Sequence, residues 1–481
     1  MAYLRDSPHF MNDLYLRNLF NELCDMKKYV LFILILTATK AWSQPANVAF
    51  EIQGLNADTV YVGYHFGSQK YLMDTLAVKD DAFVLEVEKV KKGLYFVYRP
   101  DYYLEFILHL GDYRLSTSRA GGTREMEVQN SKENSLFQQF QKTMIGLQSE
   151  QRSLSEKLQE ASGEDSLQIR RSLQQLATDQ EEFRQGLISD NPETFLASFV
   201  GLMDEVAVPK MDEISDEKER QKRRYNYYKE HYFDNVDLSD PALLRTPLLH
   251  NKVMKYFNDV LVQHPDTLIQ GVDFLFNQVN NEPELFRYWL VTLFKKYAEA
   301  KIMGLDKVMI HLIEHYYLTP QVDWISEEYE KTLREEVAYI KHNVIGNEAP
   351  PLNVVDTLMQ PFSLRQVASE YTLLFIYDPD CGHCKKAIKK LEELDTEFAN
   401  QGVEVVAVCT TTDVDKWKNF VSEHNPMWHH TIDPTGKSYF RVYYDVRSTP
   451  KIYLLDGQKK IIAKKLDVEQ LLDFVKNAEK L

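Results

Sequence analysis

The chain has 481 residues, a formal net charge of −16 and four cysteines. This length predicts several domains rather than one small module. A hydrophobic fraction of 44% is enough for buried cores, which excludes a wholly disordered chain. The acidic balance argues against bulk nucleic-acid binding, because an acidic surface repels phosphate. Four cysteines are too few to staple a chain of this length, so any role they have is expected to be chemical.

The N-terminal region has the pattern of a secretory signal peptide. A basic start precedes an apolar run at 29–38, and small residues close the pattern before Gln44. We therefore expect a signal peptide over 26–43 and an exported protein of the periplasm or cell envelope, without a membrane span in its mature form. The alternative is a hydrophobic N-terminal helix or anchor, although the run is shorter than the roughly 20 residues of a membrane span. Residues 1–25 carry four acidic side chains, unlike a signal sequence, which predicts that they are a non-native extension before Met26.

Residues 44–130 are predicted to form an antiparallel β domain that resembles a sandwich. Apolar residues alternate with period two in three stretches, at Val48, Phe50, Ile52, then Val60, Val62, Tyr64, then Phe83, Leu85, Val87. Further short apolar runs follow at 94–98 and 103–108, and glycines punctuate the intervals. Short strands at this spacing are typical of small all-β domains. No cluster of residues in this stretch suggests chemistry.

Residues 131–345 are predicted to form an all-α middle region. The first apolar stripe has helical spacing at Leu136, Phe137, Phe140, Met144 and Leu147. A break at Ser162-Gly163 separates it from a second stripe, so the two arms are expected to pair as an antiparallel helical hairpin. Helical patterns continue to about Asn343 without a fixed repeat period, which argues against a solenoid.

One stretch of the middle region invites a functional interpretation. Basic residues and tyrosines interleave between Lys218 and Tyr232, a composition that can bind single-stranded nucleic acid. Acidic residues flank the same stretch, so a solvated amphipathic helix explains it better. We expect no nucleic-acid partner.

The C-terminal region, 346–481, carries the residues expected to do chemistry. Glycine and two prolines at 346–351 end the helical pattern, and the apolar run 372–377 predicts a buried strand. Cys381-Gly382-His383-Cys384 follows at once and opens a helical pattern. Unpaired N–H groups at a helix N-terminus stabilise a thiolate, so Cys381 is expected to be a nucleophile at neutral pH. Cys384 can then attack the mixed disulfide and release the product.

A CxxC pair could instead be half of a zinc site. A second pair of ligands should then follow, and the chain offers only Cys409 and the adjacent His429-His430. We therefore predict no metal, and we interpret Cys409 as a buried core residue.

The order of elements after the CxxC resembles the thioredoxin superfamily. A strand ending at Cys409, a helix around Trp417, the Ser448-Thr449-Pro450 segment, a hairpin at Asp456-Gly457 and a terminal helix follow in the order of that fold. The lead-in at 349–356 is similar to the extra N-terminal hairpin of TlpA/ResA-like thiol–disulfide oxidoreductases. The resemblance implies that Cys381 attacks, that Cys384 resolves, and that Pro450 is a cis-proline preceded by the substrate-binding residue Thr449. The earlier regions resemble, more diffusely, two domains of unknown function that precede such modules in envelope proteins of Bacteroidetes.

Three positions depart from the family pattern. Phe375 stands where thioredoxins carry a buried acid, Ala387 where ResA-like proteins often carry Glu, and Asp380 where a Trp is usual. His383, Asp378 or water would then have to accept the proton of the resolving thiol. His383 favours a more oxidising disulfide, whereas Asp378 and Asp380 oppose it by repelling the thiolate.

The resulting hypothesis is a thiol–disulfide oxidoreductase of the cell envelope with no cofactor beyond the redox-active disulfide Cys381–Cys384. Its expected partners are client proteins with thiols or disulfides, and an upstream redox donor or acceptor protein. One alternative is an envelope interaction protein that uses the thioredoxin-like fold as a platform. Another is a peroxiredoxin-type peroxidase, which is disfavoured because Asp378 occupies the place of the Thr that such an enzyme needs.

Overall fold

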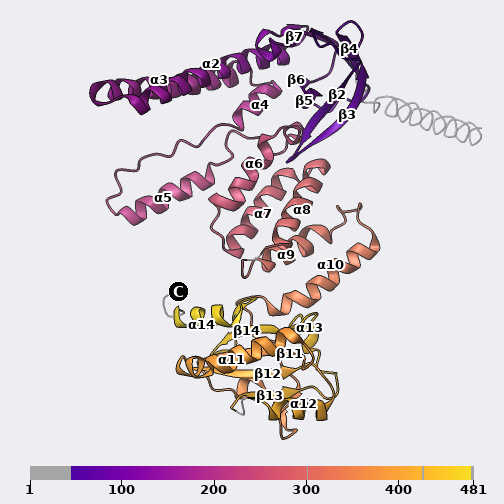
Figure 1. Ribbon diagram of the computed structural model, residues 1–481, viewed down its shortest axis with the longest axis vertical. Coiled ribbons are helices and arrows are strands. Elements are labelled where there is room, and N and C mark those ends of the chain that lie inside the picture. Colours follow the sequence, from indigo (N-terminus) through magenta and orange to yellow (C-terminus); the bar gives the residue numbers. More distant parts are fainter. Residues whose placement is uncertain (1–44, 301, 425–426, 478–481) are drawn as a thin grey trace, which may run out of the picture. The chain divides into compact units, whose positions relative to one another are not determined.

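The computed structural model describes residues 45–300, 302–424 and 427–477. The predicted N-terminal extension and signal peptide lie outside the described residues. The chain divides into two compact units, one of Met1–Asp204 with Ala242–Leu249 and one of Glu205–Pro241 with His250–Leu481. Along the chain, strands come first, helices next, and a mixed α/β domain last (Figure 1), which confirms the predicted multidomain fold class. Within the described ranges, the helices are all too short or too polar to cross a bilayer.

The first unit begins with two four-stranded sheets. One has the order β4-β1-β7-β8, formed by β4 (Ala82–Val87), β1 (Ala46–Gln53), β7 (Tyr113–Ser118) and β8 (Glu127–Gln129). The other has the order β3-β2-β5-β6, formed by β3 (Gln69–Ala77), β2 (Thr59–Phe66), β5 (Gly93–Arg99) and β6 (Tyr102–Leu108). The pairing is antiparallel except that β1 and β7 run parallel, so the prediction of an antiparallel domain was wrong for this one pair.

The two sheets share one apolar core. Phe50 of β1 stacks on Phe83 with ring centroids 4.7 Å apart, and it meets Phe106 of β6 edge-on at 5.0 Å. Because Phe106 belongs to the second sheet, these contacts place the inward faces of both sheets against each other, as in a sandwich. The alternating apolar residues of the sequence supply this core.

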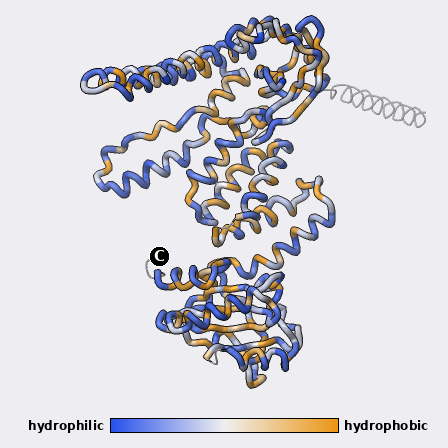
Figure 2. The backbone as a smooth tube through the Cα atoms, in the orientation of Figure 1, coloured by the Kyte–Doolittle hydropathy of each residue, from blue (hydrophilic) through white to orange (hydrophobic). Residues whose placement is uncertain are grey.

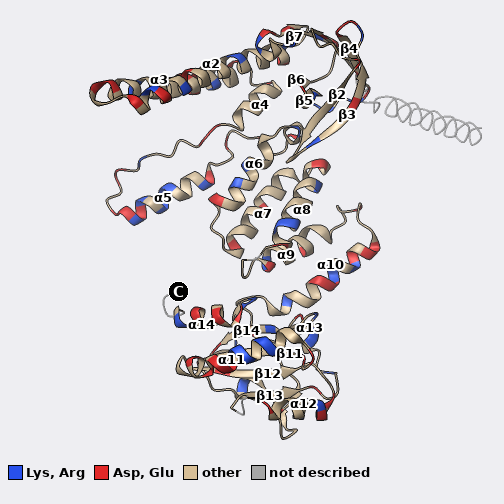
Figure 3. Cartoon of the chain, viewed as in Figure 1, with Lys and Arg blue, Asp and Glu red and all other residues tan. Residues whose placement is uncertain are grey.

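Helices α2 (Lys132–Glu160) and α3 (Gly163–Asp190) form an antiparallel hairpin, followed by the short α4 (Phe195–Gly201). Ser131 caps α2 by accepting a hydrogen bond from the N–H of Asn134 at 3.1 Å. The arms meet where Phe140 stacks on Phe183, 6.4 Å between centroids. Acidic and basic residues alternate along both arms (Figure 3), which is typical of a solvated helical pair.

The second unit begins with the remaining helices. These are α5 (Glu217–Glu230), α6 (Leu248–Lys255, shared with the first unit at its start), α7 (Pro265–Val279), α8 (Pro283–Ala298), α9 (Asp306–Leu312) and α10 (Glu327–Ile340). Trp289 on α8 is fully buried and stacks on His250 at 6.0 Å. Helix α5 has no buried residue and is hydrophilic along its length (Figure 2), and Arg223 pairs with Glu219 on its surface. Basic residues of this stretch therefore pair with acidic residues of the same helix.

The C-terminal α/β domain is built on a seven-stranded sheet of order β10-β9-β13-β12-β11-β14-β15. The strands are β9 (Val354–Val355), β10 (Pro361–Phe362), β11 (Tyr371–Tyr377), β12 (Val403–Cys409), β13 (His429–Ile432), β14 (Lys451–Asp456) and β15 (Ile461–Lys464). The helices are α11 (Gly382–Asn400), α12 (Val414–Ser422), α13 (Phe440–Tyr443) and α14 (Val468–Asn477). Strands β11, β12 and β13 are parallel, whereas β14 and β15 are antiparallel to their neighbours.

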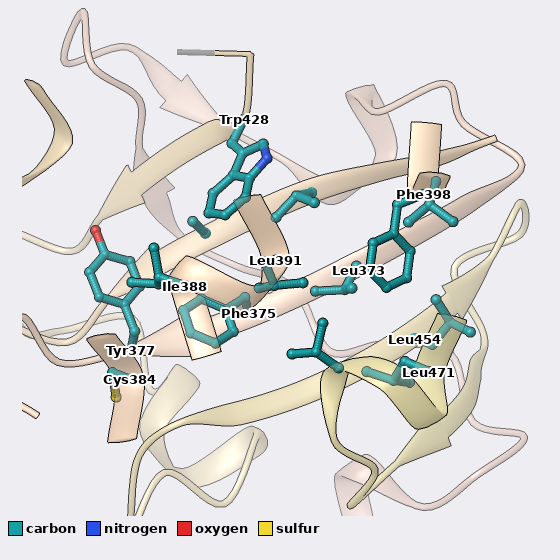
Figure 4. Packing of buried hydrophobic residues seen from close by; sticks show 14 of the residues in the cluster. Leu373, Phe375, Tyr377, Cys384, Ile388, Leu391, Phe398, Trp428, Leu454 and Leu471 are labelled. Atoms are coloured by element: carbon teal, nitrogen blue, oxygen red, sulfur yellow. The ribbon is translucent and has the colours of Figure 1, made fainter. Parts of the chain in front are cut away.

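The central strands bury side chains on both faces of the sheet. Leu373 and Phe375 point into the core shared with α11 and α14 (Figure 4), whereas Leu374 packs in the core with α13. A parallel strand covered by helices on both faces needs a continuous apolar run, which is why the segment 372–377 carries no alternation. Strand β11 ends at Tyr377, and a turn of three residues separates it from the CxxC motif.

Candidate active site

The CxxC motif lies at the start of α11, after the turn that follows β11. Asp378-Pro379-Asp380 forms the turn, and the N–H of Cys381 donates to the carbonyl of Asp378 at 3.1 Å. Cys381 is the N-cap of α11, and its Sγ accepts a hydrogen bond from the N–H of Cys384 at 3.3 Å. A thiol in this position faces the unpaired N–H groups of the first helical turn, which favour negative charge.

A loop far along the chain completes the surroundings of Cys381. The Cys381 Sγ lies 3.4 Å from the carbonyl oxygen of Thr449, and the Thr449–Pro450 peptide bond is cis. The tertiary fold therefore brings together the CxxC motif and Pro450, as the sequence hypothesis requires for a substrate groove beside the thiols. Neither cysteine of the motif is in a disulfide, so the structure corresponds to the dithiol form.

The two thiols of the motif differ in acidity. Burial by itself raises the pKa of Cys381, but hydrogen bonds from the Cys384 thiol and from the backbone N–H groups of Cys384 and His383 outweigh it. The pKa of Cys381 is therefore lowered below the ordinary thiol value. Cys384 is fully buried, and burial together with the neighbouring Cys381 raises its pKa to about 11. A partly exposed thiol of lowered pKa beside a buried thiol of raised pKa is the division of roles that disulfide exchange uses.

Cys409 differs from the two cysteines of the motif in its location and in its pKa. It is fully buried at the end of β12, and burial raises its pKa to about 11. Among the residues that the structure describes, no three His, Cys, Asp or Glu side chains gather as a metal ion would require. His429 instead bonds to Glu404 at 2.9 Å.

The remaining predicted site residues surround the thiols at the surface. Gly382 and His383 occupy the exposed first turn of α11. Asp378 is half-buried, and its carboxylate accepts hydrogen bonds from the N–H of Asp380 at 2.8 Å and from the hydroxyl of Thr410 at 3.2 Å. Asp378 thus holds the turn that presents Cys381, in addition to placing a charge near it.

The sequence did not predict one charged neighbour of the site, Lys416. Lys416 on α12 pairs with the carboxylate of Asp380, and this hydrogen bond lowers the pKa of Asp380. The two residues are 36 positions apart, and nothing in the local pattern links them. The cation offsets part of the repulsion that Asp380 would exert on a thiolate at Cys381.

Known proteins are similar to the middle and C-terminal regions of this chain. The model of the AhpC/TSA family matches residues 345–464, and that of a domain of unknown function, DUF5106, matches 175–343. The thiol-disulfide oxidoreductase ResA of Bacillus thuringiensis subsp. konkukian is 28% identical over 136 residues, which are 27% of this chain and 77% of that protein. The chain belongs to the thioredoxin superfamily, as a TlpA/ResA-like member.

Two solved structures are also similar to this TlpA/ResA-like chain. A domain of a possible thiol-disulfide isomerase from Cytophaga hutchinsonii is 33% identical, covering 28% of this chain and 94% of that one, with a TM-score of 0.27. A thioredoxin-like protein from Bacteroides caccae is 20% identical, covering 57% of this chain and 97% of that one, with a TM-score of 0.43.

The departures from the family pattern have visible structural consequences. Phe375, at the place of the thioredoxin acid, is fully buried in the core of the TlpA/ResA-like domain. Ala387, where family members often carry Glu, is half-buried on α11 and lines a cleft. Asp380 is exposed instead of providing an aromatic cover. The thiol of Cys384 therefore lies in an apolar environment, which explains its raised pKa.

Proposed function

We propose that this protein exchanges disulfides with client proteins in the cell envelope through Cys381 and Cys384. The observation that carries the proposal is the asymmetry of the two thiols: Cys381 is partly exposed with a lowered pKa, and Cys384 is buried with a raised one. The names of the ResA relatives support this activity. Location in the envelope is supported by the signal-peptide pattern at 26–43.

The proposed reaction has two exchange steps. The Cys381 thiolate attacks one sulfur of a client disulfide, so a mixed disulfide forms and the other client sulfur leaves as a thiolate. Cys384 then loses its proton and attacks the Cys381 sulfur, which closes the Cys381–Cys384 disulfide and releases the second client thiol. The client gains two electrons and the CxxC pair loses them, and a partner protein must return these electrons. The same steps in reverse oxidise a client dithiol.

A trapping experiment tests the proposal. Cys384→Ala should accumulate covalent complexes with envelope proteins, because the resolving step is removed. Dithiothreitol should release these complexes, and Cys381→Ala should abolish them. Cys409→Ala is the matched control, since this buried thiol lies outside the site and the pattern of complexes should not change. Absence of complexes, with no reduction or oxidation of model substrates by the wild type, would refute the proposal in favour of an interaction platform.

Two further measurements test the peroxidase alternative and the export of the protein. The carboxylate of Asp378 already accepts bonds from Thr410 and Asp380, and its charge would repel a developing peroxide anion. Cys381-dependent consumption of hydrogen peroxide, measured with the purified protein, would nevertheless replace the exchange proposal.

For export, the N-terminal mass of material from the envelope should correspond to a chain that starts at Gln44, and a different start would overturn the cleavage site.

A further inference from the structure

A cleft of about 800 Å³ lies within the second unit beside the CxxC motif. Pro450 and Ala387 line it from the C-terminal domain, and residues of α8, α9 and α10 line it from the helical region. Ala387 follows Cys384 by three residues on α11, and Pro450 follows the residue whose carbonyl contacts Cys381. The cleft therefore reaches α11 just after the CxxC motif and the cis-proline loop, and continues along a surface that the helical region supplies.

Buried polar contacts hold the helical wall of this cleft in place. Lys464 of β15 forms an ion pair with Asp306 at the start of α9, and each side chain is only 4% exposed. The Nζ of Lys464 also donates to the Oδ1 of Asn343 at 2.9 Å, and the amide of Asn343 donates to the carbonyl of Tyr443 at 3.0 Å. Charges are buried in this way only when they are paired, so the contact has a defined geometry.

A second set of contacts joins the helical wall to the cis-proline loop. Arg447 binds Glu336 of α10 with both terminal nitrogens, at 2.5 and 3.1 Å. Asp445 accepts from Arg447 and, at 2.9 Å, from Lys451, which stands on the other side of Pro450. A bidentate pair restrains orientation as well as distance, so α10 helps to position the loop that faces Cys381.

Six cationic side chains line the cleft against five acidic ones, which gives it a net charge of +1. Its five acidic lining residues are all engaged: four in ion pairs (Asp306, Glu336, Asp445 and Glu469) and the last as a cap that accepts from the start of α14 (Asp467). Lys386 and Lys465 also line the cleft, both are exposed, and neither has an ion pair among the described residues. In a chain of net charge −16, these two lysines make a local positive site on the cleft that Pro450 also lines.

We infer that this cleft binds an extended client segment that carries acidic residues next to its cysteine, and that Lys386 and Lys465 select those residues. The inference rests on the proposed disulfide exchange and adds the class of client to it. The volume is in the range of about 300–1,000 Å³ that ligand pockets occupy, which suits a few residues of polypeptide rather than a folded surface. Complementary charge near the thiol would raise the rate of productive encounter.

The test uses the reduced full-length protein and three eight-residue peptides. Each peptide has one cysteine in a disulfide with 2-mercaptoethanol, flanked by Asp, Ser or Lys. Exchange oxidises the protein dithiol and releases the peptide thiol and 2-mercaptoethanol, and stopped-flow fluorescence gives the rate constant. Bis(2-hydroxyethyl) disulfide is the uncharged reference. The variants are Lys386→Glu, Lys465→Glu and the double variant, with Lys389→Glu as the control because Lys389 is exposed on α11 outside the cleft.

The wild type should react about two- to 25-fold faster with the Asp peptide than with the Lys peptide, because each of the two exposed charge pairs contributes roughly 1.4- to fivefold. This preference should shrink in 0.5 M salt, persist in Lys389→Glu, and reverse in the double variant. Equal rates with all three peptides, or the same ratio in the double variant as in the control, would overturn the inference. No reaction of the wild type with any peptide or with the uncharged disulfide would instead overturn the proposed exchange, and the inference with it.

Discussion

The buried ion pair between Lys464 and Asp306 makes a sharp prediction about stability. Each side chain is 4% exposed, and burial lowers the pKa of Lys464 although the carboxylate of Asp306 opposes the shift. Replacing Asp306 by Asn keeps the size of the side chain but removes the charge that compensates the lysine. The folded variant must then either bury an unpaired ammonium or deprotonate it.

The cost of deprotonating Lys464 in the folded variant gives the expected loss of stability. Deprotonating a lysine with an ordinary pKa of about 10.4 at pH 7 costs about 4.6 kcal/mol. Breaking buried ion pairs by removal of one partner costs about 3–5 kcal/mol in general, which agrees. We therefore expect Asp306→Asn to lower the free energy of unfolding by about 3–5 kcal/mol at pH 7. The double variant Asp306→Asn with Lys464→Met should recover most of this loss, because no unpaired charge remains.

The pH dependence separates this explanation from simple loss of packing. In Asp306→Asn the folded-state pKa of Lys464 lies below its unfolded value, so the unfolded chain binds more protons near neutrality. Stability of the variant should then rise with pH, by up to about 1.4 kcal/mol per unit, until the pH approaches about 10.4.

Urea unfolding of the full chain at pH 7 and pH 9.5, followed by tryptophan fluorescence, measures both effects. Asp266→Asn is the matched control, because Asp266 pairs with Lys307 at an exposed site and should change stability little. The reasoning is refuted if Asp306→Asn is as stable as the control, or if its loss of stability is the same at both pH values.

Three further outcomes follow from the site. In the reduced protein, iodoacetamide should modify Cys381 at a lower pH than Cys384, because their pKa values are shifted in opposite directions, and peptide mass mapping across pH 5–10 would show the order. Asp380→Asn should lower the pKa of Cys381 by a few tenths of a unit, since a repelling charge is removed, and the same alkylation profile would reveal no shift if the carboxylate does not act on the thiol. Glu336→Gln should weaken the contact with the cis-proline loop and lower kcat/KM for peptide disulfides about three- to tenfold at a similar melting temperature, whereas Glu335→Gln, whose exposed side chain pairs with Lys331, should not.

Some parts of the fold escaped the sequence for identifiable reasons. Strand β3 was not predicted, because its side chains are exposed on both faces and apolar alternation is therefore missing. The parallel pairing of β1 with β7 was also missed, since strand direction depends on which distant segments meet and not on the period of either strand. The boundaries between the predicted domains, and the roles of Cys381, Cys384, Thr449 and Pro450, stay predictions that the experiments above address.

By itself, the sequence determined the elements whose signals are local. A buried strand, a CxxC at a helix start and a Thr-Pro segment in the right order were enough to predict a thioredoxin-like domain, because the period of apolar residues and the chemistry of cysteine act over a few positions. Only the tertiary structure decided what surrounds the thiols. The ion pair of Asp380 with Lys416, and the cleft wall fixed by Glu336 and Arg447, join side chains 36 and 111 positions apart. Such contacts form when the packing of whole elements brings side chains together, and no local pattern encodes them.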